Sequence, residues 1–122
     1  MQKGNSLSER FERTIPCGEV NGSWLGKQIT LVGWVHRRRD HGGLIFIDLR
    51  DRAGLMQLVF DPTISFDAHK SAQDLRSEYV IQVMGTVVER APQTINRELP
   101  TGHWELKVEK LFVLAQSKTI PF

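Results

Sequence analysis

The stretch GWVHRRRDHGGLIFIDLRD, residues 33–51, places three consecutive arginines between two segments with the composition of buried strands. Within residues 44–50 one face carries Ile45, Ile47 and Leu49, the expected core residues, whereas the other carries Leu44, Phe46, Asp48 and Arg50. Period-2 alternation of this kind predicts a β-strand with one buried face. The Asp-His-Gly-Gly tetrapeptide before it is typical of a hairpin turn. The stretch therefore predicts two antiparallel strands joined by a tight turn.

Further elements are predicted on both sides of this hairpin. Ala68, Ala72, Leu75 and Tyr79 recur at helical spacing, and Ser65 is a suitable N-cap. The predicted elements are strands over 28–36, 44–50, 55–60, 79–90 and 104–115, a helix over 65–77, and a long loop over 91–102. Three strands, a helix and two more strands is the order of an OB-fold. The fold prediction is therefore an all-β protein with one helix: a five-stranded OB-fold barrel with the helix between strands 3 and 4.

The bulk composition fits one small domain. The chain has 122 residues, a formal net charge of +2 and one cysteine, Cys17. A lone cysteine excludes an internal disulfide and fits a cytoplasmic location. No apolar run approaches the ~20 residues of a membrane span. We expect residues 1–15 to be a flexible lead-in, 16–115 the barrel, and 116–122 the start of a linker.

The interior glycines of two predicted strands fit the strong curvature of a small barrel. Gly33 lies inside the first strand and Gly85 inside the fourth. Glycine inside a strand indicates a bulge or a sharp coil. We therefore expect the chain to bend at both positions.

An OB barrel binds ligands on its strand 2–3 face and with the loops that here span 40–43 and 91–102. On that face Phe46 is a candidate stacking platform for a nucleobase, or else it covers the end of the barrel. The run Arg37–Arg39 offers forked donors for phosphates. The alternative for the same run is a solvated surface paired with Asp40, Asp48 and Asp51.

Three further polar residues fit base recognition. Gln57 carries a paired donor and acceptor on the third strand, and Glu105 could accept from a base amino group. Asn96 lies in the long loop, where recognition residues are common. The alternatives are that Gln57 is a solvent-facing strand residue and that the loop is merely mobile.

The chain shows no pattern that supports catalysis or metal binding. It lacks a nucleophile elbow and a phosphate-binding glycine loop, and its four histidines lack metal-like spacing. Cys17 is expected to be an inert thiol. We therefore expect this chain to be no enzyme by itself and to hold no cofactor or metal.

Four segments occur in the following order: LVGWVHRRRDHGGLIFIDLRDRAGLMQLVFDP, LRSEYVIQVMGTVVER, INRELPTG and WELKVEKLFVL. Together they closely resemble the N-terminal anticodon-binding domain of bacterial-type aspartyl-tRNA synthetases, over about residues 16–122. The resemblance implies a tRNA-binding module whose parent enzyme joins aspartate to its tRNA with ATP and magnesium. That reaction occurs in a separate class II catalytic domain, which would follow residue 122, and the parents are typically homodimers.

The resemblance also implies roles for individual residues. Phe46 matches an aromatic residue that stacks on the middle anticodon base, and Glu105 matches a glutamate that reads the wobble guanine. The remaining matches to anticodon-contacting residues are Arg39, Gln57, Arg90 and Asn96. His41, in Asp-His-Gly-Gly, resembles the first loop of relaxed-specificity members, which charge both tRNA(Asp) and tRNA(Asn). These assignments imply reading of a GUC anticodon and, in the relaxed subtype, GUU.

Two other functions remain open from the residues. The barrel could bind single-stranded nucleic acid in general, or it could bind another protein with its basic face merely solvated. A general binder would hold oligo-dT about as well as an anticodon stem-loop, and a protein-interaction domain would hold neither.

Overall fold

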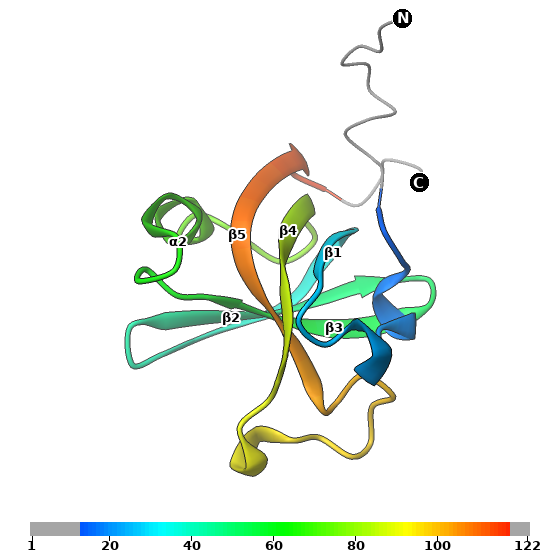
Figure 1. Cartoon of the computed structure of the whole chain (residues 1–122). Coiled ribbons are helices and arrows are strands. Elements are labelled where there is room, and N and C mark those ends of the chain that lie inside the picture. The colour runs from blue at the N-terminus through cyan, green and yellow to red at the C-terminus, as the bar shows by residue number, and fades with distance from the viewer. Residues whose placement is uncertain (1–12, 118–122) are drawn as a thin grey trace, which may run out of the picture.

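Five strands form a closed barrel in the order β1-β2-β3-β5-β4 (Figure 1). The computed structural model describes residues 13–117. Within them lie β1 (Gln28–His41), β2 (Leu44–Asp51), β3 (Gly54–Phe60), α2 (Phe66–Ala72), β4 (Val80–Glu89) and β5 (Trp104–Ala115). Neighbouring strands pair antiparallel except β3 and β5, which run parallel. The predicted five-stranded OB-fold with one helix between strands 3 and 4 is confirmed.

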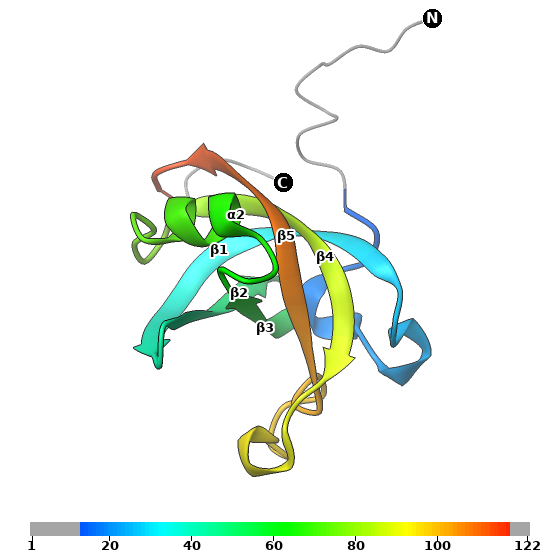
Figure 2. The ribbon, with the colours of Figure 1, turned by 60° about the vertical axis from the view of Figure 1, so that its left-hand side comes forward.

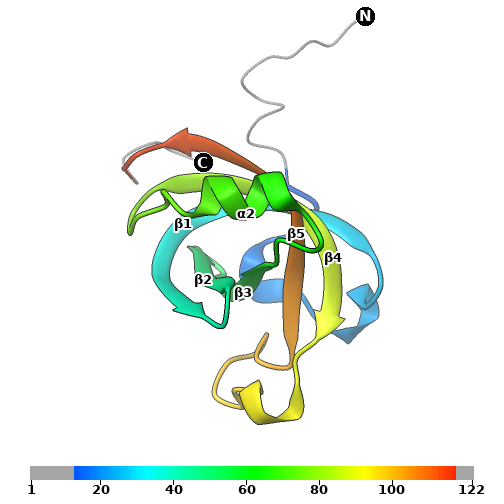
Figure 3. The same cartoon turned by 90° about the vertical axis from the view of Figure 1, so that its left-hand side faces the viewer.

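The barrel interior is filled by the alternating apolar faces of the strands. In β2 the three predicted core residues, Ile45, Ile47 and Leu49, are buried, and the residues between them are half-buried. In α2 the buried residues are Ala68 and Ala72, and they join the same core. The helix contacts β2, β3 and β5, so it covers one end of the barrel (Figure 3).

The hairpin of β1 and β2 is longer than predicted. β1 continues to His41, so all three arginines lie inside a strand, and only Gly42 and Gly43 form the turn. Both glycines have a positive φ, +58° and +85°, which other residues adopt with strain. β1 pairs with β4 only up to Trp34, and beyond that point it pairs with β2. The hairpin therefore projects from the barrel, toward the left in Figure 1.

The two strand glycines mark close approaches between strands. A Cβ at Gly33 would lie 2.3 Å from the carbonyl oxygen of Arg50, and one at Gly85 would lie 2.2 Å from that of Lys107. The register of β1 against β2 shifts between Val35 and Arg37, just past Gly33, and that of β4 against β5 shifts between Met84 and Gly85. The irregularity expected at Gly85 is therefore present, whereas the one in β1 lies beyond Gly33. Gly33 is required because the backbones of β1 and β2 meet there.

The helix is shorter than the predicted span 65–77. Ser65 is the N-cap, and its side-chain oxygen accepts from the amide of Ala68 at 3.2 Å. The helix ends at Ala72, and turns then bury Leu75 and half-bury Tyr79. The apolar spacing of the sequence continued past the helix end, because residues in tight turns can also face the core. Figure 2 shows α2 beside β1 and β5.

Short 3-10 turns complete the described chain. They span Cys17–Glu19, Gly22–Trp24 and Pro92–Thr94. Cys17 is fully buried, and its amide donates to a carboxylate oxygen of Asp51 at 2.7 Å. The predicted lead-in and linker boundaries stay predictions, since residues 1–12 and 118–122 lie outside the described residues.

Candidate functional site

A groove of about 650 Å³ lies between the β1–β2 hairpin and the β4–β5 loop. It is lined by Arg37, Arg39, Asp40, His41, Phe46, Asp48, Gln57, Arg90, Thr94, Asn96 and Leu99. Six of the seven predicted site residues are in this set. The seventh, Glu105, accepts a hydrogen bond from Gln57. Residues more than 60 positions apart in the chain are thus brought together, at the place where an OB-fold binds ligands.

The floor of the groove is a continuous chain of hydrogen bonds. Arg39 donates to Asp48 at 3.2 Å and to Oε1 of Gln57 at 3.1 Å. Nε2 of Gln57 in turn donates to Glu105 at 2.8 Å. β3 and β5 make this possible, because their parallel pairing sets Gln57 directly beside Glu105. Arg39 and Glu105 fix the orientation of the Gln57 amide, whereas an amide without partners could rotate.

Gln57 is buried, with 4% of its surface exposed. The alternative of a solvent-facing strand residue is therefore wrong. Every buried polar atom of the described side chains has a hydrogen-bond partner, so the network is satisfied without a ligand. Asp48 belongs to it but was missed as a site residue. Its position on the same strand face as Phe46 was the signal that could have identified it.

Phe46 is half-buried and lines the groove. The guanidinium of Arg39 lies over its ring, 5.7 Å from the centroid, a favourable arrangement of cation and aromatic face. β1 and β2 place these two residues directly opposite each other. The ring is therefore accessible to a ligand in the groove while Arg39 and its strand hold it in place.

The three arginines have different surroundings. Arg37 is exposed and lines the groove. Nη1 of Arg38 donates to three backbone carbonyls at the end of α2, those of Ala72, Gln73 and Leu75, at 3.3, 2.8 and 3.1 Å. Arg38 also makes a two-point contact with Asp40 at 2.9 and 3.0 Å. The interpretation of the run as one phosphate-binding set is therefore wrong for Arg38, which is a structural residue.

The alternative, a run paired with nearby aspartates, holds for two of the three expected acids. Asp40 pairs with Arg38 and Asp48 pairs with Arg39. The hydrogen bond from Arg38 lowers the pKa of the Asp40 carboxyl below its ordinary value. Asp51 instead lies 3.8 Å from Arg13 and accepts from backbone amides in the β2–β3 turn.

The β4–β5 loop is held by specific contacts. Arg90 is buried at 7% exposure and donates to the carbonyls of Trp104 and Thr94 at 3.1 and 3.0 Å. Burial lowers the pKa of its guanidinium, although the charge stays, since arginine titrates far above neutrality. Thr101, also buried, donates to the carbonyl of Leu55 on β3. The loop is thus anchored at both ends, contrary to the alternative of a merely mobile loop.

Besides Arg39, two predicted groove residues are exposed. His41 ends β1 beside the turn. Asn96 projects from the β4–β5 loop, and its side-chain oxygen accepts from the amide of Glu98 at 3.0 Å. Both are available to a ligand that spans the groove from the hairpin to the loop.

Cys17 lies outside the groove. Burial raises the pKa of the Cys17 thiol well above its ordinary value, which fits an inert cysteine. Within residues 13–117 no three histidine, cysteine or carboxylate side chains gather as a metal site would require. No helix in the same span is long and apolar enough to cross a membrane.

Comparison with known proteins agrees with this geometry. A family model described as the OB-fold nucleic acid binding domain, of the tRNA anticodon type, matches residues 29–114. An aspartate–tRNA(Asp/Asn) ligase of Protochlamydia amoebophila is 54% identical over 118 residues, which are 97% of this chain and 20% of that protein. An aspartate–tRNA ligase of Staphylococcus aureus is 51% identical over 91% of this chain and 19% of its own length.

Solved structures agree as well. Asparaginyl-tRNA synthetase from Pyrococcus horikoshii superposes with a TM-score of 0.71 at 30% identity, covering 90% of this chain and 24% of that one. The chain spans about a fifth of the length of the curated relatives named above.

Proposed function

This chain belongs to the family of OB-fold nucleic acid binding domains that bind tRNA anticodons, and we propose that it reads the anticodon for an aspartate–tRNA ligase. One observation carries the proposal. An accessible aromatic ring, Phe46, shares one groove with Arg39 and Gln57, and Gln57 is hydrogen-bonded to both Arg39 and Glu105. Stacking gives affinity for any base, whereas oriented donors and acceptors distinguish one base from another.

The proposed roles are those that the resemblance to anticodon-binding domains implies, and the groove holds the residues near one another. Phe46 stacks on the middle base, a uracil, and Gln57 and Arg39 contact the same region. Glu105 uses one oxygen on Gln57, and its other oxygen would accept from the wobble guanine. The outer contacts would come from Arg90, Asn96 and His41.

The rest of the enzyme is part of the same proposal. The parent would be a class II aspartate–tRNA ligase that uses ATP and magnesium, acts in the cytoplasm and forms a homodimer. In this proposal residues 16–115 are the anticodon-binding domain, 1–15 a lead-in and 116–122 the start of the connection to the catalytic domain. This domain itself would need neither ATP nor magnesium, and its partner would be tRNA(Asp).

A competition measurement tests the proposal. A labelled anticodon stem-loop with GUC is bound to the 122-residue chain, and unlabelled stem-loop or oligo-dT is added. We expect the stem-loop to compete at much lower concentration than oligo-dT, and a stem-loop with a changed middle base to compete poorly. Equal competition by oligo-dT would instead indicate a general single-strand binder, and no binding to either at low salt would indicate a protein-interaction domain.

A second binding comparison tests whether the domain accepts only tRNA(Asp) or also tRNA(Asn). Relatives of both kinds match this chain, an aspartate–tRNA(Asp/Asn) ligase and an aspartate–tRNA ligase. Within the proposed function His41 favours the relaxed form, which accepts tRNA(Asn) as well. GUC and GUU stem-loops would then bind with similar affinity, whereas a strong preference for GUC would contradict the relaxed form.

A further inference from the structure

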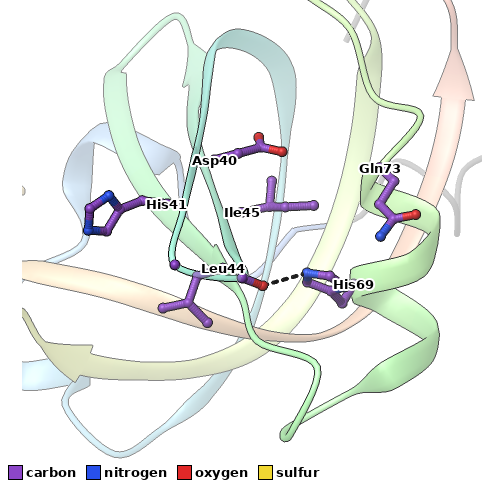
Figure 4. Close-up of a pocket in the computed structure, with 8 residues that line it drawn as sticks. Asp40, His41, Leu44, Ile45, His69 and Gln73 are labelled. Atoms are coloured by element: carbon purple, nitrogen blue, oxygen red, sulfur yellow. Dashed lines mark hydrogen bonds between the residues drawn. The ribbon is translucent and has the colours of Figure 1, made fainter.

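A second pocket, of about 300 Å³, separates the tip of the β1–β2 hairpin from α2 (Figure 4). It is lined by Asp40, His41, Gly42, Gly43, Leu44, Ile45, His69 and Gln73. One hydrogen bond crosses it. Nε2 of His69 lies 2.8 Å from the carbonyl oxygen of Gly43. A carbonyl can only accept, so Nε2 carries the proton and donates.

The hairpin tip extends past the last pair that β2 makes with β3. β1 leaves β4 after Trp34, and β2 pairs with β3 only as far as Ile45, which lies opposite Phe60. The β1–β2 ladder continues to His41 and Leu44, so residues 41–44 lie beyond the support of a third strand. The turn glycines add no side-chain contact of their own. The bond from His69 therefore ties the most projecting part of the binding groove to the body of the protein.

The helix that carries His69 is itself fixed to the base of the hairpin. Arg38 of β1 donates to the carbonyls at the C-terminal end of α2. Ala68 and Ala72 anchor the neighbouring face of the helix in the core. A rigid helix attached at both places can transmit its position to the turn.

His69 acts from outside the groove. Figure 4 shows the His41 side chain on one side of the hairpin and the His69 side chain on the other, next to α2. The groove includes His41 but not His69. An effect of His69 on a ligand in the groove is therefore indirect, and its hydrogen bond to Gly43 is the contact that links it to the turn.

We propose that His69 is a positioning residue for anticodon recognition, because its hydrogen bond to Gly43 sets the hairpin tip and with it His41. The inference rests on the proposed function. The tip would otherwise sample several positions, and the RNA would have to order it on binding, at a cost in affinity. His69 is thus a specificity-supporting residue that touches no RNA.

The first test needs no RNA. Amide exchange of a peptide covering the hairpin tip is compared in the wild-type chain, His69→Leu and His69→Gln. Leucine keeps the bulk and removes the donor, whereas glutamine restores an N–H. We expect tip exchange to accelerate about 3- to 10-fold in His69→Leu, the range for loss of one net hydrogen bond, and to return toward wild type in His69→Gln. Gln73→Ala, in the same pocket, is the control and should leave exchange unchanged.

The second test measures affinity for the GUC stem-loop with the same four proteins. His69→Leu should bind about 3- to 10-fold more weakly, with His69→Gln within about 2-fold of wild type. Equal behaviour of the leucine and wild-type chains, or of the leucine and glutamine variants, would overturn the inference. If the leucine variant misfolds, His69→Ala against His69→Gln makes the same comparison. If the wild-type chain fails to bind the stem-loop, the proposed function fails, while the exchange experiment still decides whether His69 holds the turn.

Discussion

Single side chains in the groove have separable tasks. Phe46 supplies an aromatic surface, Gln57 an oriented amide, and Arg39 a charge that also bonds both Asp48 and Gln57. The surface ion pair of Arg39 with Asp48 contributes little stability by itself, since its arginine is largely exposed. The ion pair instead orients the Arg39 guanidinium, which lies over the Phe46 ring and donates to the Gln57 amide.

Phe46→Ala should weaken binding of the GUC stem-loop by about 1–3 kcal/mol, because one stacking surface is lost. The ring is half-buried outside the core, so the far-ultraviolet spectrum and cooperative unfolding should persist. Phe66→Ala is the matched control, since that ring is 65% exposed on α2 and lines no part of the groove. Unchanged affinity in folded Phe46→Ala would rule out the stacking role.

Arg39→Ala should flatten the dependence of log affinity on log salt by about 0.7 for each phosphate contact that is lost. Arg39→Lys should retain the slope but lose affinity, because lysine keeps the charge without the fork. Arg52→Ala, in the exposed β2–β3 turn, should change neither. An unchanged slope in Arg39→Ala would exclude a phosphate contact and leave a base contact as its role.

At the level of elements, α2 is coupled to the hairpin by charge and geometry. Its last carbonyls would otherwise lack partners inside the helix, and Arg38 supplies donors to them. A cation at this end also interacts favourably with the helix dipole. Arg38 therefore caps the end of α2 although it belongs to β1. Its side chain points toward the helix and away from the groove.

Arg38→Ala should reduce the free energy of unfolding by about 1–3 kcal/mol, because hydrogen bonds from a charged donor are lost at a partly buried helix end. Arg37→Ala should change it by less than about 0.5 kcal/mol, as expected for an exposed surface position. Urea denaturation of the two variants measures both values. Equal stability of the two variants would contradict the capping role of Arg38.

The whole molecule depends on closing one sheet into a barrel. β1 pairs with β4 over its first half and with β2 over its second half. Gly33 pairs with Ile81 of β4, next to Trp34, which is the first residue of β1 opposite β2. The three backbones can converge there because no Cβ stands between Gly33 and Arg50. Closure in turn brings β3 and β5 together and so creates the Gln57–Glu105 contact.

Gly33→Ala should destabilise the chain by about 1–3 kcal/mol or more, because the added methyl would lie 2.3 Å from a backbone oxygen that cannot move freely. Gly26→Ala adds a methyl into open space, and only the backbone strain of its φ of +80° opposes it. Thermal unfolding compares the two, with the larger loss expected for Gly33→Ala. A Gly33→Ala chain as stable as wild type would show that β1 and β2 can separate at this crossing.

The fold was predictable from the sequence because alternation is a local property. Each strand shows its buried face within a few residues, and Ser65 and the glycine turn mark their elements directly. The predicted helix end at residue 77 lies beyond the observed end at Ala72. Leu75 and Tyr79 keep the helical spacing, although they lie in turns that face the core. The buried state of Gln57 was not predictable either, since it depends on Glu105 and Arg39, which are distant in sequence.

The sequence by itself determined the five strands, the order that forms an OB barrel, and the residue types that suit nucleic acid. Only the tertiary structure decided which two of the three adjacent arginines line the groove and which one caps a helix. Successive residues in a strand point to opposite faces, so a charge run is divided by the pleat. The partners of each arginine then depend on elements that are distant in sequence. On one face Arg39 meets β3 and, through Gln57, β5; on the other face Arg38 meets the end of α2.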